Sequence, residues 1–187
     1  MLLALVLIAA GWEADLKIRA QGQPAPASAQ GHLRVQDNKV RMEQEGAPAI
    51  TLYDHDAGTI ILLRAGKQTF QVRPAEGGPA EQPGPPTCPD GDVASCLQKQ
   101  GFTRVGAETL DGVATVVYAR RRSAGEERIW RDEALPGLVY RKQLAPVPGA
   151  TLEIDFVNLR AGPQPEAQFR PPPEYKPAEP AQRRRRR

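Results

Sequence analysis

Between Lys39 and Val72 the chain alternates short apolar bursts with turn residues at nearly regular intervals. Strands of about four to eight residues bounded by Gly, Pro, Asn and Asp are typical of an antiparallel meander. The burst Thr59–Leu63 is apolar on both faces, which indicates a central strand whose second face is also covered. This run therefore predicts a mainly β protein, and it contains few reactive side chains.

The same alternation continues on both sides of this run. Leu16, Ile18 and Ala20 alternate with basic residues, and Leu152, Ile154 and Phe156 alternate with acidic ones. Asp111-Gly112, between two apolar runs, is a strong signal for a tight hairpin. An antiparallel sheet of about ten strands must curl or close to protect its edges. We expect a curved antiparallel sheet that forms a half-open barrel.

One short helix is expected after the Pro- and Gly-rich stretch. Asp92 is placed as its N-cap, and Gly101 lies where a helix commonly ends. Val93, Cys96 and Leu97 recur at helical spacing and share one face. The helix is therefore expected to pack against the concave side of the sheet and to cover the second face of Thr59–Leu63.

The two ends of the chain differ in composition from this body. Residues 1–11 form an apolar run that is shorter than the roughly 20 residues of a membrane span, and they end in small residues. They are interpreted as a signal peptide, although no Lys or Arg precedes them, and a buried first strand or helix stays open as the alternative. The prediction is export to the periplasm or cell envelope, with one β domain over 12–162, a mobile Pro/Gly-rich loop over 74–91 and an extended tail over 163–187.

The positive charge is concentrated at the C-terminus. The formal charge is +3, and without the last five residues it is −2, since these are Arg183, Arg184, Arg185, Arg186 and Arg187. No aromatic residue is interleaved for base stacking, and Arg120–Arg122 alternates across a predicted strand, so nucleic-acid binding is not expected. If the tail binds a target, an anionic envelope surface fits its charge.

The reactive residues point away from enzymatic chemistry. The three serines lie outside any Gly-x-Ser-x-Gly motif, so a hydrolytic triad is not expected. The three residues Asp54-His55-Asp56 point to alternate faces of a strand and are interpreted as a polar strand end, not a metal site. Cys88 and Cys96 lack C-x-x-C spacing and are predicted to form a disulfide in an oxidising compartment. No cofactor, metal or catalytic residue is predicted.

Four segments together resemble a known family: WEADLKI, NKVRMEQEG, GAETLDGVATVVY and GPQPEAQFRPPPEYK. Over residues 12–176 the chain is similar to exported envelope proteins that share the LolA/LolB lipoprotein-carrier fold. The matching positions are Gly106, Glu108, Gly112 and Tyr118 in the hairpin, then Phe169, Pro172 and Tyr175 near the end. The resemblance implies an unclosed antiparallel barrel whose concave side can hold an acyl chain. It implies no established activity.

The candidate ligand-binding residues are inward-facing apolar side chains. They are Ile61, Leu63, Tyr118, Tyr140, Ile154 and Phe156. The same residue types would line a lipid cavity or fill a packed core, and both interpretations stay open. The leading hypothesis is a monomeric, non-enzymatic envelope protein that binds or carries a lipid or a lipidated partner. The alternative is an interaction or sensor module with a filled core.

Overall fold

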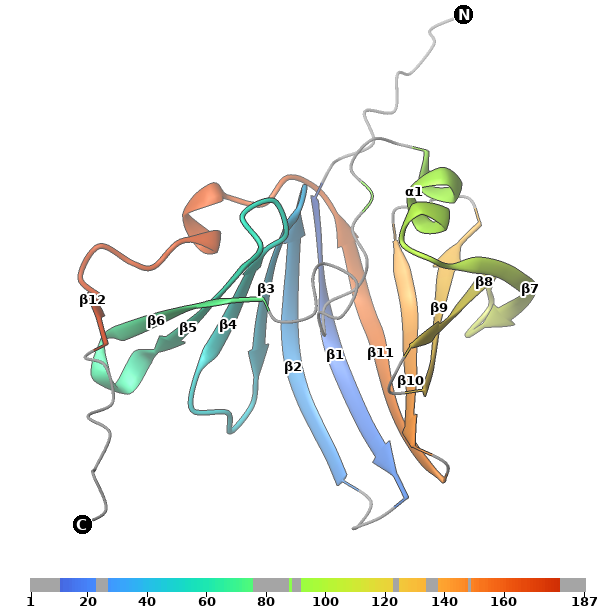
Figure 1. The fold of residues 1–187 in the computed structure, drawn as a ribbon, viewed down its shortest axis with the longest axis horizontal. Coiled ribbons are helices and arrows are strands. Elements are labelled where there is room, and N and C mark those ends of the chain that lie inside the picture. The colour runs from blue at the N-terminus through green and yellow to red at the C-terminus, as the bar shows by residue number, and fades with distance from the viewer. Residues whose placement is uncertain are drawn as a thin grey trace, which may run out of the picture.

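The computed structural model describes residues 11–22, 27–75, 88, 92–122, 125–133, 138–147 and 149–178. The predicted signal segment 1–10, most of loop 74–91 and the arginines 183–187 lie outside these residues. The first strand begins at Gly11, the residue at which the predicted signal peptide 1–11 ends. Figure 1 shows the arrangement of the elements.

Twelve strands of the described residues form one sheet, in the order β12-β6-β5-β4-β3-β2-β1-β11-β10-β9-β8-β7. The first half of the sheet comprises β1 (Gly11–Gln21), β2 (Ala27–Gln36), β3 (Lys39–Gln44), β4 (Ile50–Asp54), β5 (Thr59–Arg64) and β6 (Thr69–Pro74). The second half comprises β7 (Thr103–Leu110), β8 (Val113–Arg122), β9 (Gly125–Asp132), β10 (Val139–Val147) and β11 (Ala150–Ala161), and the two-residue strand β12 (Lys176–Pro177) follows. Two meanders therefore meet where β11 returns to pair with β1. The predicted curved antiparallel sheet is confirmed (Figure 1).

The strict alternation of β1 and β11 sets the two faces of the sheet. Leu16 lies opposite Phe156 and Ile18 opposite Ile154, while the charged residues between them face the other side. We call the face that carries Leu16 and Phe156 the concave face and the opposite one the convex face. Because side chains alternate along every strand, the register then assigns each residue of the ladder to one of these faces.

The helix α1 (Val93–Lys99) begins and ends where the sequence predicts. Asp92 caps it by accepting a hydrogen bond from the Ser95 amide at 3.1 Å, and Gly101 follows it with φ +83°. Val93 and Leu97 are buried in the same cluster as Trp12 and Phe156, so the helix packs on the concave face as expected.

Residues 163–178 do not leave the sheet as the predicted tail does. The Gln164 amide donates to Gln36 Oε1 at 2.7 Å, and the Gln168 carbonyl accepts from Arg41 Nη1 at 2.9 Å. The short 3-10 helix η3 (Glu166–Phe169) lies over β3, and β12 then pairs in parallel with β6. We call residues 163–178 the C-terminal strap. Its proline-rich sequence suits this extended path across the convex face, so the assignment of all of 163–187 as a tail is corrected for these residues.

The strap also corrects the expected cover of Thr59–Leu63. The convex side of this strand carries Ile61 and Leu63, and Leu52 lies beside them opposite Ile61. The strap contacts β3 through Gln168 and pairs with β6 through β12, so its path leads past β4 and β5, and its Phe169 is buried to 6% exposure. The convex side of β5 is therefore assigned to the C-terminal strap, whereas α1 packs on the concave face.

Candidate functional site

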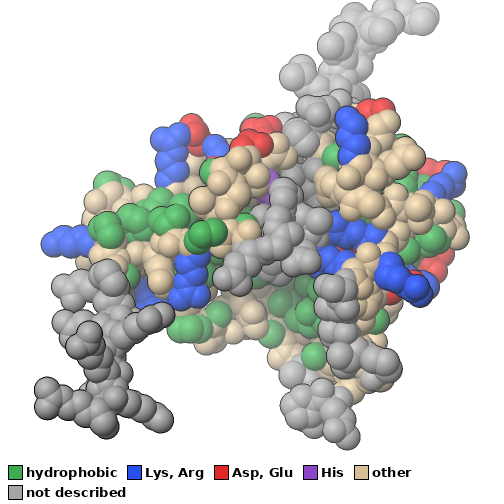
Figure 2. All heavy atoms as spheres, viewed as in Figure 1, with side chains coloured by type: hydrophobic (Ala, Val, Ile, Leu, Met, Phe, Trp, Pro, Cys, Tyr) green, Lys and Arg blue, Asp and Glu red, His purple; other side chains and the backbone are tan. Residues whose placement is uncertain are grey.

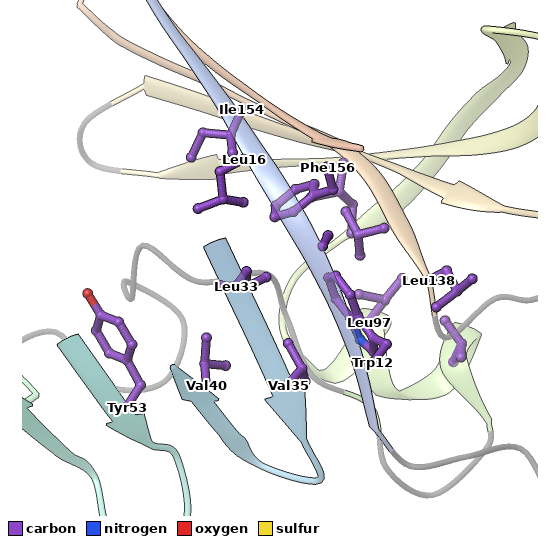
Figure 3. Packing of buried hydrophobic residues seen from close by; sticks show 14 of the residues in the cluster. Trp12, Leu16, Leu33, Val35, Val40, Tyr53, Leu97, Leu138, Ile154 and Phe156 are labelled. Carbon is purple, nitrogen blue, oxygen red and sulfur yellow. The ribbon is translucent and has the colours of Figure 1, made fainter. Parts of the chain in front are cut away.

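A continuous apolar surface covers the middle of the concave face (Figure 3). Its buried members come from β1, β2, β3, β4, β9, β10, β11 and the segment around α1. They are Trp12, Ala14, Leu16, Leu33, Val35, Val40, Tyr53, Val93, Leu97, Phe102, Ile129, Leu138, Val139, Ile154 and Phe156. The Trp12 and Phe156 rings meet edge to face with centroids 5.9 Å apart. This part of the concave face is a packed core.

Around that core the apolar surface extends to side chains that are only partly buried. They are Ile18, Met42, Ile60, Cys88, Tyr118, Tyr140, Leu152 and Leu159. Among the described residues, α1 is a helix of seven residues, and its own buried side chains are Val93 and Leu97. The apolar surface of the concave face therefore consists of a packed core and a margin of partly buried side chains.

Four of the six predicted ligand-binding residues lie together on the concave face. Ile154 and Phe156 belong to its core, and Tyr118 and Tyr140 pack at its margin. Ile61 and Leu63 lie on the convex face, because Ile61 pairs with Leu52 and the concave residue Tyr53 pairs with Ile60. The structure thus separates these two from the other four, and contact with a ligand stays a prediction for the remaining residues.

A cluster of buried charges adjoins the apolar surface on the concave face. Glu127 of β9 is fully buried and forms ion pairs with three basic side chains. Arg120 Nη2 lies 2.6 Å and Arg122 Nε 3.3 Å from Glu127 Oε2, and Lys142 Nζ lies 2.9 Å from Oε1. The Arg120 guanidinium also stacks 4.3 Å above the Phe102 ring. We call Arg120, Arg122, Glu127 and Lys142 the basic cluster.

Burial dominates the electrostatics of this region. Desolvation lowers the pKa of Lys142, and Arg122 and Arg120 lower it further, while Glu127 opposes the shift. On the same strand face as Glu127, burial also lowers the pKa of Arg131 to about 10. Buried charges of this kind are retained in proteins where they are paired or serve a function.

The basic cluster is not among the sequence-based predictions. The predicted alternation of Arg120–Arg122 is correct for Arg121, but Arg120 and Arg122 share the concave face with Lys142. A signal was present, because Lys142 lies two residues before the apolar Leu144 and therefore shares the inward face of its strand. The partner Glu127 could not be assigned, since its meeting with Lys142 depends on the register of β9 against β10.

The two cysteines meet beside α1. Cys88 and Cys96 are joined by a disulfide with their Cα atoms 5.8 Å apart, and Gln100 Nε2 lies 3.3 Å from the Cys96 sulfur. The bond ties residue 88 to the helix that packs on the concave face. This is the pairing that the sequence predicts, and it fixes the end of the segment that precedes α1.

The acidic residues around His55 serve the local turn. Asp54 Oδ1 accepts from the Ala57 amide at 2.9 Å, and Asp56 Oδ1 accepts from Asn38 Nδ2 at 2.8 Å. Burial lowers the pKa of His55, against the two neighbouring carboxylates. Within the described ranges, no three His, Cys, Asp or Glu side chains are grouped as metal ligands.

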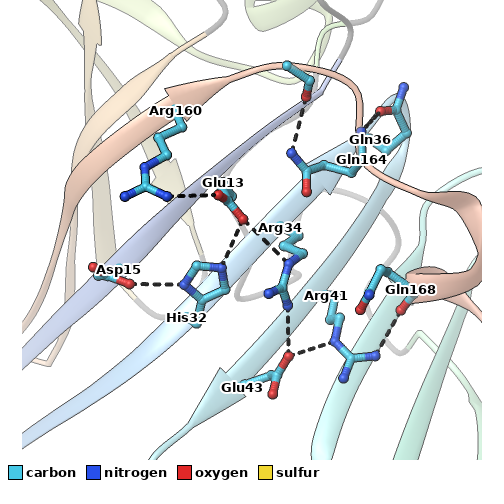
Figure 4. Close-up of polar contacts among 11 residues, drawn as sticks. Glu13, Asp15, His32, Arg34, Gln36, Arg41, Glu43, Arg160, Gln164 and Gln168 are labelled. Carbon is cyan, nitrogen blue, oxygen red and sulfur yellow. Dashed lines mark hydrogen bonds and ion pairs between the residues drawn. The ribbon is translucent and has the colours of Figure 1, made fainter.

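Over β1, β2 and β3 the convex face carries a polar network (Figure 4). His32 Nδ1 lies 2.9 Å from Asp15 and its Nε2 lies 3.4 Å from Glu13, while Arg34 Nη1 donates to Glu43 at 3.0 Å. A surface cavity of about 340 Å³ lies next to Asp15 and is lined largely by polar residues. This polar lining makes the cavity a poor site for an acyl chain.

Comparison with known proteins identifies the fold. No family model matches the chain, and no curated protein matches it. An uncharacterized conserved protein from Thermus thermophilus shares the fold, with a TM-score of 0.59 at 10% identity over 91% of both chains. A LolA superfamily protein from Nitrosomonas europaea has a TM-score of 0.44 at 8% identity, over 87% of this chain and 90% of that one. A DUF1329 family protein from Desulfovibrio piger has a TM-score of 0.44 at 10% identity, with the same coverage.

The likeness to the Thermus thermophilus protein establishes the fold alone, because the two sequences share 10% identity. Separately, none of the helices among the described residues is long and apolar enough to cross a membrane.

Proposed function

We propose that this protein is a non-enzymatic protein of the periplasm or cell envelope that binds or carries a lipid, or the acyl chains of a lipidated partner. The observation that carries the proposal is the apolar surface of the concave face, which continues beyond its packed core to side chains that are only partly buried. An acyl chain on such a surface needs no catalytic group. Burial supplies roughly 0.8 kcal/mol per methylene, so a chain of about ten buried methylenes outweighs much of the cost of association.

The contrast between the two faces supports the same proposal. The convex face is occupied by ion pairs, such as those of Arg34 and Arg41 with Glu43, and by the C-terminal strap. The concave face presents tyrosine, isoleucine and leucine side chains at the margin of a packed core. A sheet with an apolar concave face and a convex face that is charged over β1 to β3 is suited to hold an amphiphile on the concave side.

The proposal is tested by looking for bound lipid in protein purified from an envelope fraction. Native mass spectrometry, followed by extraction, is expected to show copurifying acyl lipid, and a fluorescent fatty-acid probe is expected to bind the delipidated protein. Replacing the partly buried concave residue Leu152 by Gln should lower the affinity for the probe by about tenfold or more, because an apolar contact with the acyl chain is lost.

The matched control is Val105→Gln, at an exposed position of the edge strand β7, which should leave probe affinity unchanged. An empty protein to which the probe never binds would refute lipid binding. That result would favour the alternative of an interaction or sensor module whose concave face is filled by its own side chains.

A further inference from the structure

One donor of the basic cluster has no hydrogen-bond acceptor. Arg122 uses Nε toward Glu127, but within the described residues its buried Nη2 has no hydrogen-bond partner. A buried donor without an acceptor costs about 1–3 kcal/mol, so an acceptor brought by a ligand would be favoured at this position. The Arg122 side chain as a whole is 16% exposed, while Nη2 itself is buried.

The other members of the cluster hold Arg122 in place and set the sign of the local field. Glu127 is fixed between Lys142 and Arg120, and its Oε2 atom in turn orients the Arg122 guanidinium. The basic cluster sets three basic side chains against the single carboxylate of Glu127, so basic groups outnumber acidic ones within it. Figure 2 shows Lys and Arg side chains gathered in the hollow over β9 and β10. An oxyanion is the ligand that such a surrounding favours.

The cluster lies at one end of the apolar concave surface. Arg122 is the last residue of β8 and pairs with Gly125, at the end of the β8–β9 ladder. Tyr118 lies four residues back on the same face, a distance of about 13 Å along the strand, and it faces Ile129. Lys142 in turn pairs with Ile154 of the apolar core. Polar and apolar contacts therefore follow one another along one face, as the two parts of an amphiphile do.

We propose that Arg122 binds the anionic head group of an acyl amphiphile, through carboxylate or phosphate oxygens, while the chain lies over the partly buried residues Tyr118 and Leu152. This rests on the proposed function and adds the chemical class of the ligand. Arg122 Nη2 donates to the ligand oxygen, and a guanidinium is suited to this because its planar donors match carboxylate and phosphate geometry. Arg120 and Lys142 act through Glu127 by positioning the Arg122 side chain.

The experiment compares two ligands of equal chain length on three proteins. Oleic acid and oleyl alcohol are titrated below their aggregation concentrations into the delipidated full chain, Arg122→Gln and Arg121→Gln. Arg121→Gln is the matched control, since it removes the same charge from the neighbouring exposed position on the convex face. We expect Arg122→Gln to lose about tenfold or more in affinity for the acid, while both variants keep the parent affinity for the alcohol.

The outcomes separate the two proposals. If the parent binds neither oleic acid nor oleyl alcohol, the proposed function fails. If it binds both and Arg122→Gln binds the acid as tightly as the parent, lipid binding stands and the assignment of Arg122 is overturned. Inorganic phosphate alone forms a third arm: tight binding of free phosphate that depends on Arg122 would overturn the amphiphile in favour of a free anion. Retained binding of the alcohol by Arg122→Gln shows that the variant is folded.

Discussion

At the scale of single residues, the backbone of the neighbouring strand β3 lies very close to Gly31 of β2. Gly31 pairs with Leu16 of β1 and with Gln44 of β3, within the part of the sheet that carries the apolar face. A Cβ atom added at Gly31 would lie 2.3 Å from the Glu43 carbonyl oxygen, closer than real Cβ contacts. The position of the Cβ atom is fixed by the backbone of residue 31, and the oxygen belongs to the backbone of Glu43, so neither atom can turn away.

Gly31→Ala is therefore expected to lower the free energy of unfolding by about 1–3 kcal/mol, as an overpacked interior does. The measurement is urea denaturation followed by circular dichroism. Gly106→Ala, at a strand glycine with nothing within 4 Å of the added atom, is the control and should be neutral or slightly stabilising. Equal stability of the two variants would show that the β2–β3 pair tolerates the methyl group.

At the scale of elements, the C-terminal strap joins strands that the meander leaves far from the end of the chain. It docks on β3 through Gln168 and extends the sheet edge at β6 through β12. Phe169 is its buried side chain, so we expect Phe169→Ala to cost about 3–5 kcal/mol in the free energy of unfolding. Glutamyl endopeptidase should also cut the variant faster after Glu166, because the strap loses its apolar contact with the sheet.

The control for the strap is Val105→Ala, an exposed position on the opposite edge strand, where a change within about 0.5 kcal/mol is expected. If Phe169→Ala unfolds at the parent urea concentration and resists glutamyl endopeptidase equally, the strap does not stabilise the sheet. In that event Ile61 and Leu63 would not depend on it for cover.

The strands and α1 could be predicted from the sequence because their signals are local. Asp92 and Gly101 bound the helix, and the strand Ala150–Ala161 alternates cleanly. Two features of the site were not predictable for a physical reason. Thr59–Leu63 is apolar on both faces, so its period of two does not say which side faces inward. The strap reads as an extended tail because one buried phenylalanine among prolines gives no periodic signal.

At the scale of the whole molecule, the pairing of β1 with β11 makes one sheet from two meanders. The basic cluster lies in the second meander, whereas the apolar surface draws residues from both. A ligand that contacts both parts would therefore bridge the two halves of the sheet. The site depends on their staying in register along β1 and β11.

The chain's two tryptophans test whether the halves unfold together, because each lies in a different meander. Trp12 of β1 is buried against Phe156, and Trp130 of β9 is buried on the convex face, where its Nε1 donates to Glu108. In each single-tryptophan variant, Trp12→Phe and Trp130→Phe, we expect the fluorescence midpoint in urea to coincide with that variant's own far-ultraviolet circular dichroism midpoint. One hydrogen-bonded sheet with a shared core should unfold in a single transition. Separate midpoints in either variant would mean that one half of the sheet can open while the other stays folded, and the site would then be assembled from two independent units.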